Sequence, residues 1–180
     1  MLNEIKIVQD TADELYSAEQ LEIALDSMAY SINKDLAASD LLALCVLNGG
    51  IITAGKLIPR LTFPLTLDSI NASRYQNKTA GGSIKWLLEP KTPLTGRNVL
   101  LIDDILDEGI TLAAIKDYCL EHGAAHVYTV VLLDKSIDKI KPITADYVGL
   151  TVENRYIFGY GLDYKGYLRN APGIYACKNL

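Results

Sequence analysis

The stretch VLLIDDILDEGIT, residues 99–111, decides how this chain folds. Its apolar beginning predicts a strand over 98–103 that is buried on both faces, as in a parallel sheet covered by helices. Two carboxylates, Asp103 and Asp104, end this strand, and Asp107 follows in a short loop before a predicted helix. Open α/β sheets bind ligands at the carboxyl ends of their parallel strands. The stretch therefore predicts both the fold and a candidate site.

Strands and helices alternate on both sides of this stretch. Ser17, followed by Gln20 three residues later, forms a capping-box pattern that predicts a helix over 17–37. Further strands are predicted at 41–47, 63–70, 83–89, 126–134 and 147–150, and further helices from Gly50 to about Pro59 and from Thr111 to His122, with Gly123 as C-cap. This order predicts a single α/β domain, residues 1–180, whose central, mostly parallel sheet is flanked by helices.

Two segments depart from this alternation. The polar stretch 71–83 predicts a mobile loop. Five of the eleven tyrosines, together with four glycines, lie in the last thirty residues. We expect a core over about 17–150, and a small aromatic hood formed by about 151–180 with the N-terminal residues.

Composition excludes several classes of protein. The 180 residues carry a formal net charge of −5 and no Lys/Arg cluster, which argues against a nucleic-acid-binding face. The three cysteines are far apart and lack zinc-ligand spacing, so reduced thiols are expected. The apolar run 41–58 is interrupted by Asn48, glycines and a lysine, which argues against a membrane span. The N-terminus lacks the layout of a signal peptide, so we expect a cytoplasmic protein.

The acidic stretch has a chemical interpretation of its own. Adjacent ionised carboxylates such as Asp103 and Asp104 repel each other, so a divalent cation or a hydroxyl-rich ligand is a natural partner. Backbone N–H groups at the start of the following helix would face a phosphate, and Thr111 could cap that helix. The alternative is a solvated strand-to-helix loop that is merely acidic.

Residues 99–111 resemble the phosphoribosyl-pyrophosphate (PRPP) signature of type I phosphoribosyltransferases. Further matches narrow the resemblance to the hypoxanthine-guanine branch: LCVLNGG (44–50), Ser73-Arg74-Tyr75, Lys135 after an apolar strand, and YIFGYGLDYKGYLRN (156–170). The matches follow the family order from about residue 40 to 175. The resemblance implies the type I fold and Mg²⁺-dependent purine salvage, in which 5-phosphoribosyl passes from PRPP to N9 of hypoxanthine or guanine and pyrophosphate leaves.

The resemblance also implies roles on the PRPP side of the site. Asp103 and Asp104 would contact the ribose hydroxyls, directly or through Mg²⁺, and Asp107 would be the general base near purine N7. The 5′-phosphate would be held by the backbone of Asp107, Glu108, Gly109, Ile110 and Thr111, and the pyrophosphate by Asn48, Gly49 and Arg169.

On the purine side, Lys135 would donate to the exocyclic O6 and so select 6-oxopurines over adenine. Tyr156 would stack on the base, the backbone of Ile157 would meet its edge, and Asp163 would bind a second Mg²⁺. Ser73, Arg74 and Tyr75 would belong to a lid that closes over the reacting groups and excludes water.

This chain departs from the family pattern at two positions. Asn48 stands where the family often has Lys, commonly with a cis peptide to the next glycine, so the pyrophosphate pocket lacks one charge. Glu108 adds a negative charge beside the expected phosphate, which is tolerable if its side chain points to solvent while its amide points inward.

Three alternatives stay open at this point. One is a xanthine-preferring or broad 6-oxopurine enzyme, since a residue near Ile157 or Asp163 could shift the preference. Another is a non-catalytic RNA-binding regulator on the same fold, which would need a basic surface. A receiver-type signalling domain fits poorly, because three acids fall at one strand end. The resemblance further suggests a homodimer or homotetramer.

Overall fold

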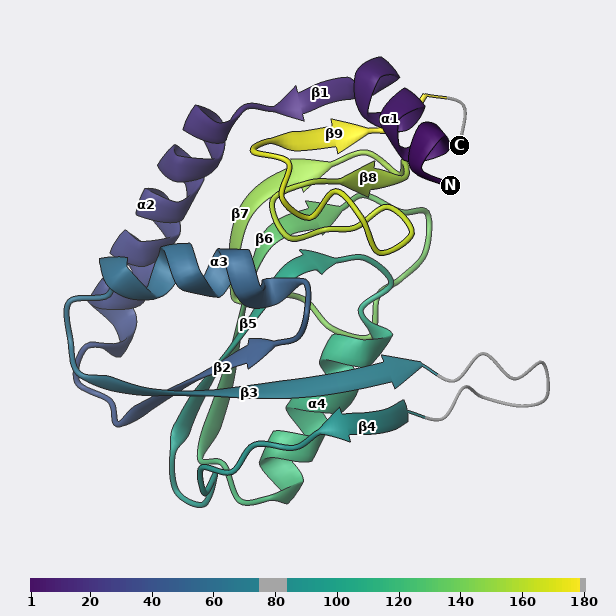
Figure 1. The fold of residues 1–180 in the computed structure, drawn as a ribbon. Helices are drawn as coiled ribbons and strands as arrows, with labels where there is room; N and C mark the ends of the chain where they lie inside the picture. The colour runs from purple at the N-terminus through teal and green to yellow at the C-terminus, as the bar shows by residue number, and fades with distance from the viewer. Residues whose placement is uncertain (75–83, 179–180) are drawn as a thin grey trace.

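A six-stranded sheet forms the centre of the molecule in the computed structural model, which describes residues 1–74 and 84–178 (Figure 1). The strand order is β4-β3-β2-β5-β6-β7. The strands are β2 (Leu41–Val46), β3 (Leu65–Arg74), β4 (Ile84–Leu88), β5 (Asn98–Leu106), β6 (His126–Lys135) and β7 (Tyr147–Val152). All neighbouring strands are parallel except β3 and β4. The predicted mostly parallel α/β fold is confirmed.

Helices cover both faces of this sheet. Helices α2 (Ala18–Leu36) and α3 (Gly50–Leu57) lie on one face, and α4 (Ile110–Glu121) lies on the other (Figure 1). A 3-10 turn, Ile58–Arg60, follows α3. Strands β2 and β5 contribute side chains to an apolar cluster on each face, which is why their sequences are almost continuously apolar. The two buried layers fix the strands whose carboxyl ends form the candidate site.

The predicted helix ends are confirmed at α2 and at the end of α4. The Ser17 hydroxyl accepts from the Gln20 amide, and the Gln20 side chain accepts from the Ser17 amide. Gly123 follows α4 with φ +87°, and the Gly123 and Ala124 amides bond back to the carbonyls of Leu120 and Cys119. This is a Schellman ending, which requires the left-handed backbone that glycine adopts readily.

Strands β3 and β5 extend furthest beyond the ends that the sequence predicted. β3 continues through residues 71–74, which were expected in a loop, because they pair with β4 in antiparallel register. β5 continues to Leu106 because its pairing with β6 extends to the Leu106–Asp134 rung. Asp103 and Asp104 therefore lie inside a strand that continues beyond them, whereas the sequence predicted that they end it. Most of the expected loop 71–83, including Tyr75, lies outside the described residues.

A second sheet of three short strands lies beside the main one. Its order is β1 (Asp13–Tyr16), β9 (Ile174–Ala176), β8 (Ile157–Phe158), so it joins residues near both ends of the chain. Helix α1 (Leu2–Thr11), which was not predicted, packs next to it through Ile5, and the N-terminus lies near the end of the described chain (Figure 1). The loop between β8 and β9 lies over the ends of β5 and β6 (Figure 1).

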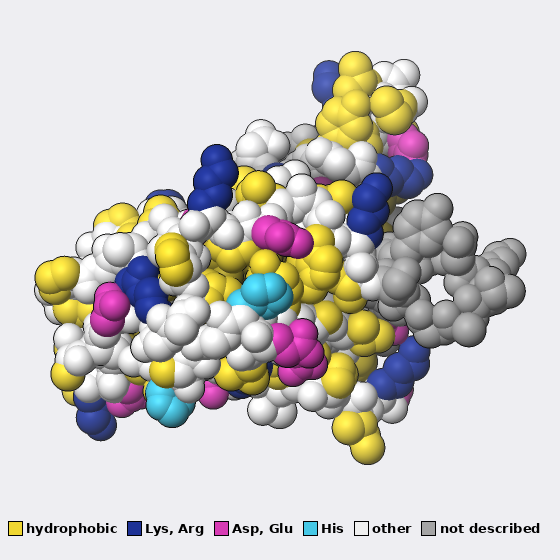
Figure 2. Space-filling model, turned by 90° about the horizontal axis from the view of Figure 1, so that it is seen from below, with side chains coloured by type: hydrophobic (Ala, Val, Ile, Leu, Met, Phe, Trp, Pro, Cys, Tyr) yellow, Lys and Arg dark blue, Asp and Glu magenta, His cyan; other side chains and the backbone are white. Residues whose placement is uncertain are grey.

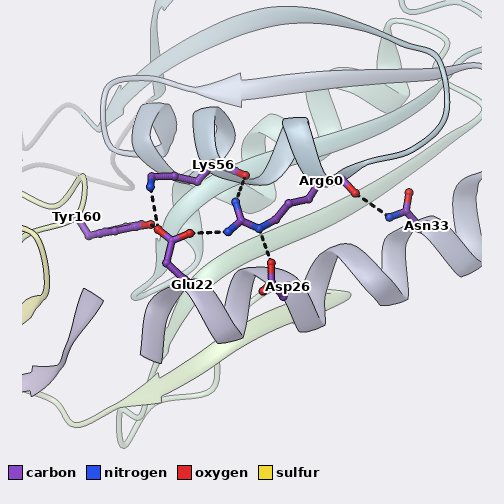
Figure 3. Close-up of polar contacts among 6 residues, drawn as sticks. All are labelled: Glu22, Asp26, Asn33, Lys56, Arg60 and Tyr160. Atoms are coloured by element: carbon purple, nitrogen blue, oxygen red, sulfur yellow. Dashed lines mark hydrogen bonds and ion pairs between the residues drawn. The ribbon is translucent and has the colours of Figure 1, made fainter. Parts of the chain in front are cut away.

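A polar network ties this loop to the helices of the main sheet (Figure 3). The Glu22 carboxylate of α2 accepts from Lys56 at 2.8 Å, from Arg60 at 2.5 Å and from the Tyr160 hydroxyl at 2.8 Å. Arg60 also donates to Asp26 at 2.6 Å. These bonds lower the pKa of Glu22 to about 2. The network connects α2, α3 and the β8–β9 loop at one point.

The described residues include no helix that is both long and apolar enough to cross a membrane. The three cysteines are buried and free of disulfides, as expected. On the face seen from below, Lys and Arg side chains are dispersed among acidic and apolar ones (Figure 2). That dispersal gives no support to an RNA-binding surface on this face.

Candidate active site

Two adjoining cavities open at the carboxyl ends of β2, β5 and β6. The larger has a volume of about 420 Å³ and the smaller about 270 Å³. Both are lined by Asp104, Ile105, Asp107 and Asp163. The larger continues along the β2–α3 turn and the β5–α4 loop, and the smaller continues towards Lys135 of β6. The site therefore has two compartments that share one wall of carboxylates.

The pair Asp103–Asp104 lies at the floor of the larger cavity. Asp104 is buried and Asp103 half-buried, and both follow the last residue of β5 that pairs with β2. The Asp104 amide donates to Asp103 Oδ1 at 2.9 Å. Burial raises the pKa of both carboxyls, and the charge of Asp104 raises that of Asp103 further. A cation or hydroxyl groups placed here would relieve this cost.

The loop after β5 wraps one end of the larger cavity. Residues 107–111 all line it, and Gly109 stands at the N-cap of α4 with φ +77°. No side chain caps this helix, so the expectation that Thr111 would cap it is wrong: Thr111 lies inside the first turn, because the helix begins at Ile110. The first-turn backbone N–H groups consequently have no side-chain cap and suit an anion.

Asn48 and Gly49 line the opposite end of the cavity, in the turn from β2 to α3. A methyl group at Gly49 would overlap the Asp104 carboxylate, and one at Gly161 would overlap the Gly49 carbonyl oxygen. Glycines thus allow three backbone segments to meet. The cis peptide of this turn joins Leu47 to Asn48. The sequence left open whether the bond from Asn48 to Gly49 is cis, and the cis bond lies one position earlier.

Asp107 and Lys135 meet between the two cavities. Lys135 Nζ donates to Asp107 Oδ2 at 2.9 Å, and the lysine side chain is only 11% exposed. The two residues follow and end adjacent strands, directly beyond the last paired rung of β5 and β6. This buried attachment argues against the solvated lysine that a lone Lys would ordinarily be.

The β8–β9 loop contributes a second ion pair. Arg169 contacts Asp163 at 2.5 Å and donates to the Gly161 carbonyl at 2.5 Å. The other Asp163 oxygen accepts from the Gly166 amide at 2.7 Å. Both charged residues line the larger cavity. They carry one negative and one positive charge to its rim, and Arg169 also favours the ionised form of Asp104.

Tyr156 and Ile157 line the smaller cavity, at the start of β8. Tyr156 is 44% exposed and touches Tyr164 edge-on, with ring centroids 5.5 Å apart. Ile157 is buried. An exposed aromatic face beside a cavity can stack on a planar ligand.

Of the other predicted residues, those of the lid are only partly described, and Glu108 lines the larger cavity. Ser73 is exposed on β3, Arg74 ends that strand, and Tyr75 lies outside the described residues. Among the described side chains of residues 71–73, Ala72 lines the larger cavity. Glu108 forms an ion pair with the exposed Lys139 at 3.5 Å. That contact provides a counter-charge for the carboxylate that the sequence left unbalanced.

Several lining residues were not predicted. They are Val46, Leu47, Ala72, Ile105, Leu106, Leu112 and Leu162, all apolar. Ile105 and Leu106 carry a signal in hindsight, since they lie between predicted acids in the same motif. The others read in sequence like any core residue.

Among the described residues, no group of three or more His, Cys, Asp or Glu side chains is placed to hold a metal ion alone. Mg²⁺ characteristically takes one or two carboxylates and completes its shell with waters and substrate phosphates. Asp103 and Asp104 supply two neighbouring carboxylates that line the larger cavity, which fits that donor set.

Comparison with known proteins places this site in a family. Residues 11–165 match the model described as the phosphoribosyl transferase domain. A hypoxanthine-guanine phosphoribosyltransferase of Lactococcus lactis is 34% identical over 161 residues, covering 89% of this chain and 87% of the relative. This chain belongs to the hypoxanthine-guanine branch of the phosphoribosyltransferase family.

Two further phosphoribosyltransferases are similar to this chain over more than 90% of its length. A hypoxanthine-guanine-xanthine phosphoribosyltransferase of Tritrichomonas foetus is 30% identical over 174 residues, covering 96% of this chain and 95% of the relative. The crystal structure of a hypoxanthine phosphoribosyltransferase from Staphylococcus aureus superposes with a TM-score of 0.87 at 28% identity, covering 92% of this chain and 91% of that one. The resemblance inferred from residues 99–111 is confirmed.

Proposed function

We propose that this protein transfers the 5-phosphoribosyl group of PRPP to N9 of hypoxanthine or guanine. The observation that carries the proposal is the pair of cavities sharing Asp104, Asp107 and Asp163, one lined by the anion-binding loop and the other by Lys135 and Tyr156. In the reaction the anomeric C–O bond to pyrophosphate breaks, the C–N9 bond forms, and the purine loses a proton. Family membership over most of the chain supports the same activity.

The larger cavity is the proposed PRPP site. The backbone of Asp107 to Thr111 would bind the 5′-phosphate, as the uncapped start of α4 suits an anion. Gly49, Asn48 and Arg169 would face the pyrophosphate. Asp103 and Asp104 would hold Mg²⁺ and the ribose hydroxyls, with Asp163 as the carboxylate for a second ion. Bound Mg²⁺ would neutralise the pyrophosphate leaving group as a Lewis acid.

The smaller cavity is the proposed purine site. Lys135 would donate to O6 of the purine, which adenine lacks, while Tyr156 stacks on the ring and the Ile157 backbone meets its edge. Asp107, within 2.9 Å of Lys135, would accept the proton from N7. One ion pair would thus both select the 6-oxopurine and deprotonate it.

Residues outside the two cavities complete the proposal. Ser73, Arg74 and Tyr75 belong to a proposed lid. Residues of about 151–180, with the N-terminal residues, form a proposed hood over the purine; the sheet β1-β9-β8 and the Gly161–Gly49 approach support it. We further propose a single domain that works in the cytoplasm as a homodimer or homotetramer.

A competition assay tests the function. Purified protein, PRPP and Mg²⁺ are incubated with hypoxanthine, guanine, xanthine and adenine, and the nucleotides are separated by chromatography. We expect IMP and GMP, little product from adenine, and loss of activity when Mg²⁺ is chelated. Strong xanthine turnover would favour the broader specificity that the Tritrichomonas foetus relative carries in its name. No nucleotide from any base, in folded protein, would overturn the proposal.

A further inference from the structure

Lys141 makes three hydrogen bonds behind the proposed purine site. Its ammonium group donates to the Leu106 carbonyl at 2.7 Å, to the Lys135 carbonyl at 2.6 Å and to Asp134 Oδ1 at 2.5 Å. An ammonium group has three N–H donors, and all three are used. The side chain is only 14% exposed. Lys141 does not line either cavity.

These acceptors surround the last rung of the β5–β6 ladder. Leu106 pairs with Asp134 in that rung, and the next residues along the two strands are Asp107 and Lys135. Lys141 therefore bonds to the backbone immediately before Asp107 and to the backbone of Lys135 itself. A change in either carbonyl position would shift the ion pair that the proposed reaction uses.

The segment that carries Lys141 also contacts the β5–α4 loop, which is the proposed 5′-phosphate site. Pro142 and Ile143 follow it, and their side chains lie 3.5 and 3.1 Å from where a Cβ of Gly109 would be. Lys139, two residues earlier, pairs with Glu108. The β6–β7 connection thus packs along the outside of the β5–α4 loop, and Lys141 is its most buried charged contact there.

We infer that Lys141 is a positioning residue: it fixes the spacing of Asp107 and Lys135 and thereby sets the geometry of the purine site. The inference rests on the proposed function, because it assigns Lys141 to the reaction proposed for these cavities. The ion pair alone would not fix this spacing, since Asp107 is half exposed and could follow Lys135 to other positions. Bonds to the backbone on both strands remove that freedom.

The test compares wild type with Lys141→Met, which keeps an unbranched apolar stem of the same length but removes the ammonium group. We expect kcat/KM for hypoxanthine to fall by about 10- to 100-fold, because even a small misplacement of the reacting groups slows a reaction by such a factor. The KM for PRPP is expected to change less than about threefold, since the phosphate loop keeps its Pro142 and Ile143 contacts. This split between substrates is the signature of positioning.

Arg97→Met is the matched control. Arg97 is 15% exposed and bonds to Asp40 at 2.8 Å and to the Leu41 carbonyl at 3.3 Å, so it links β5 to β2 at the opposite end of the sheet. Its loss removes a comparably buried cation, so we expect a lower melting temperature and unchanged hypoxanthine kinetics. An equal fall in kcat/KM for both variants would reduce Lys141 to a structural role and overturn the inference.

A second variant covers the case in which Lys141→Met does not fold. Asp134→Asn keeps an acceptor for Lys141 but removes its counter-charge, and we expect a fall in the same direction of about threefold to tenfold. Unchanged hypoxanthine kinetics in an active, folded variant would overturn the inference alone. Wild-type protein that forms no nucleotide would overturn the proposed function, and with it the inference.

Discussion

The ion pair of Asp107 and Lys135 joins two opposite requirements of the proposed reaction. The purine needs a donor at O6 and an acceptor at N7, and these two groups are neighbours on one edge of the base. Lys135 and Asp107 are 28 residues apart in sequence, yet Nζ and Oδ2 lie 2.9 Å apart. The ion pair therefore places the O6 donor and the N7 acceptor next to each other before the purine binds.

Asp107→Asn separates proton acceptance from placement. Asparagine has the same shape and still accepts from Lys135, but it is not a base at neutral pH. We expect kcat for IMP formation to fall by about 10²- to 10⁴-fold, the usual contribution of a positioned general base. The measurement is steady-state kinetics with hypoxanthine and PRPP. Asp117→Asn, an exposed acid on α4, is the control. Full activity of Asp107→Asn would remove the general-base assignment.

Individual residues were predictable where a motif defines their place. Asp103, Asp104 and Asp107 were named from thirteen residues, because an apolar strand followed by acids and a glycine fixes their order at the sheet edge. Thr111 was misread as a cap because sequence alone does not say whether a helix begins at residue 110 or 112. The partner of Glu108 was not predictable, since Lys139 comes from a separate connection.

At the scale of elements, the turn from β2 to α3 is limited by space. Gly49 has φ −59° and ψ −47°, which any residue adopts, so its backbone alone does not demand glycine. The constraint is the Asp104 carboxylate, which occupies the position of a Cβ. The turn and the end of β5 can therefore approach only if one of them lacks a side chain.

Gly49→Ala is expected to push the turn away from Asp104. We expect a loss of about 1–3 kcal/mol in the free energy of unfolding, as for other overpacked sites. The KM for PRPP should rise, because Gly49 and Asp104 line the same cavity. Urea unfolding and PRPP saturation kinetics measure the two effects.

Gly55→Ala is the control, in the neighbouring helix α3. Apart from the backbone of the helix itself and the two neighbouring residues, no atom of the described residues lies within 4 Å of a Cβ at this position, so alanine fits. Its better helix propensity predicts a gain of about 0.5–1 kcal/mol with unchanged PRPP kinetics. If Gly49→Ala were as stable and as active as Gly55→Ala, the turn would accommodate a Cβ beside Asp104, and the prediction would be wrong.

Strand ends depend on partners that a single segment does not reveal. Three of residues 71–74 are polar, so their sequence favours a loop, but pairing with β4 makes them part of a strand. β5 extends past Asp103 for the same reason, through β6. Helix α2 was predictable to within a residue because its capping box is local.

At the scale of the whole molecule, the sheet β1-β9-β8 was the least predictable part. Its strands have four, three and two residues, and two of them pair across more than 150 residues of chain. Such short strands carry no periodicity of their own. The tyrosines of residues 151–180 predicted aromatic packing, and Tyr160 and Tyr164 of the β8–β9 loop are buried. The pairing of β9 with residues 13–16 could not be predicted without the fold.

The Glu22 network connects this part of the molecule to the main sheet, and it should make stability depend on pH. The pKa of Glu22 is about 2 in the folded protein against an ordinary value of 4.5. A carboxyl whose pKa is lowered by folding stabilises the fold fully at a pH above its pKa in the unfolded state. That stabilisation is lost as the pH falls towards its pKa in the folded state. The relevant window is therefore about pH 4.5 down to about 2.

Glu22→Gln tests this dependence. The carboxylate is about one-third exposed, so solvent screening reduces its contribution, and we expect the variant to be less stable than wild type by about 1–2 kcal/mol at pH 7. The difference should shrink by more than half between pH 5 and pH 3, because wild type then loses what the variant already lacks. Urea unfolding at pH 7, 5 and 3 measures this difference in the free energy of unfolding.

Asn33→Ala is the control, because Asn33 bonds to the Arg60 carbonyl at 2.9 Å without titrating (Figure 3). The loss in free energy of unfolding caused by Asn33→Ala should not change with pH. If the loss caused by Glu22→Gln did not change with pH either, the charge of the Glu22 carboxylate would not contribute to stability.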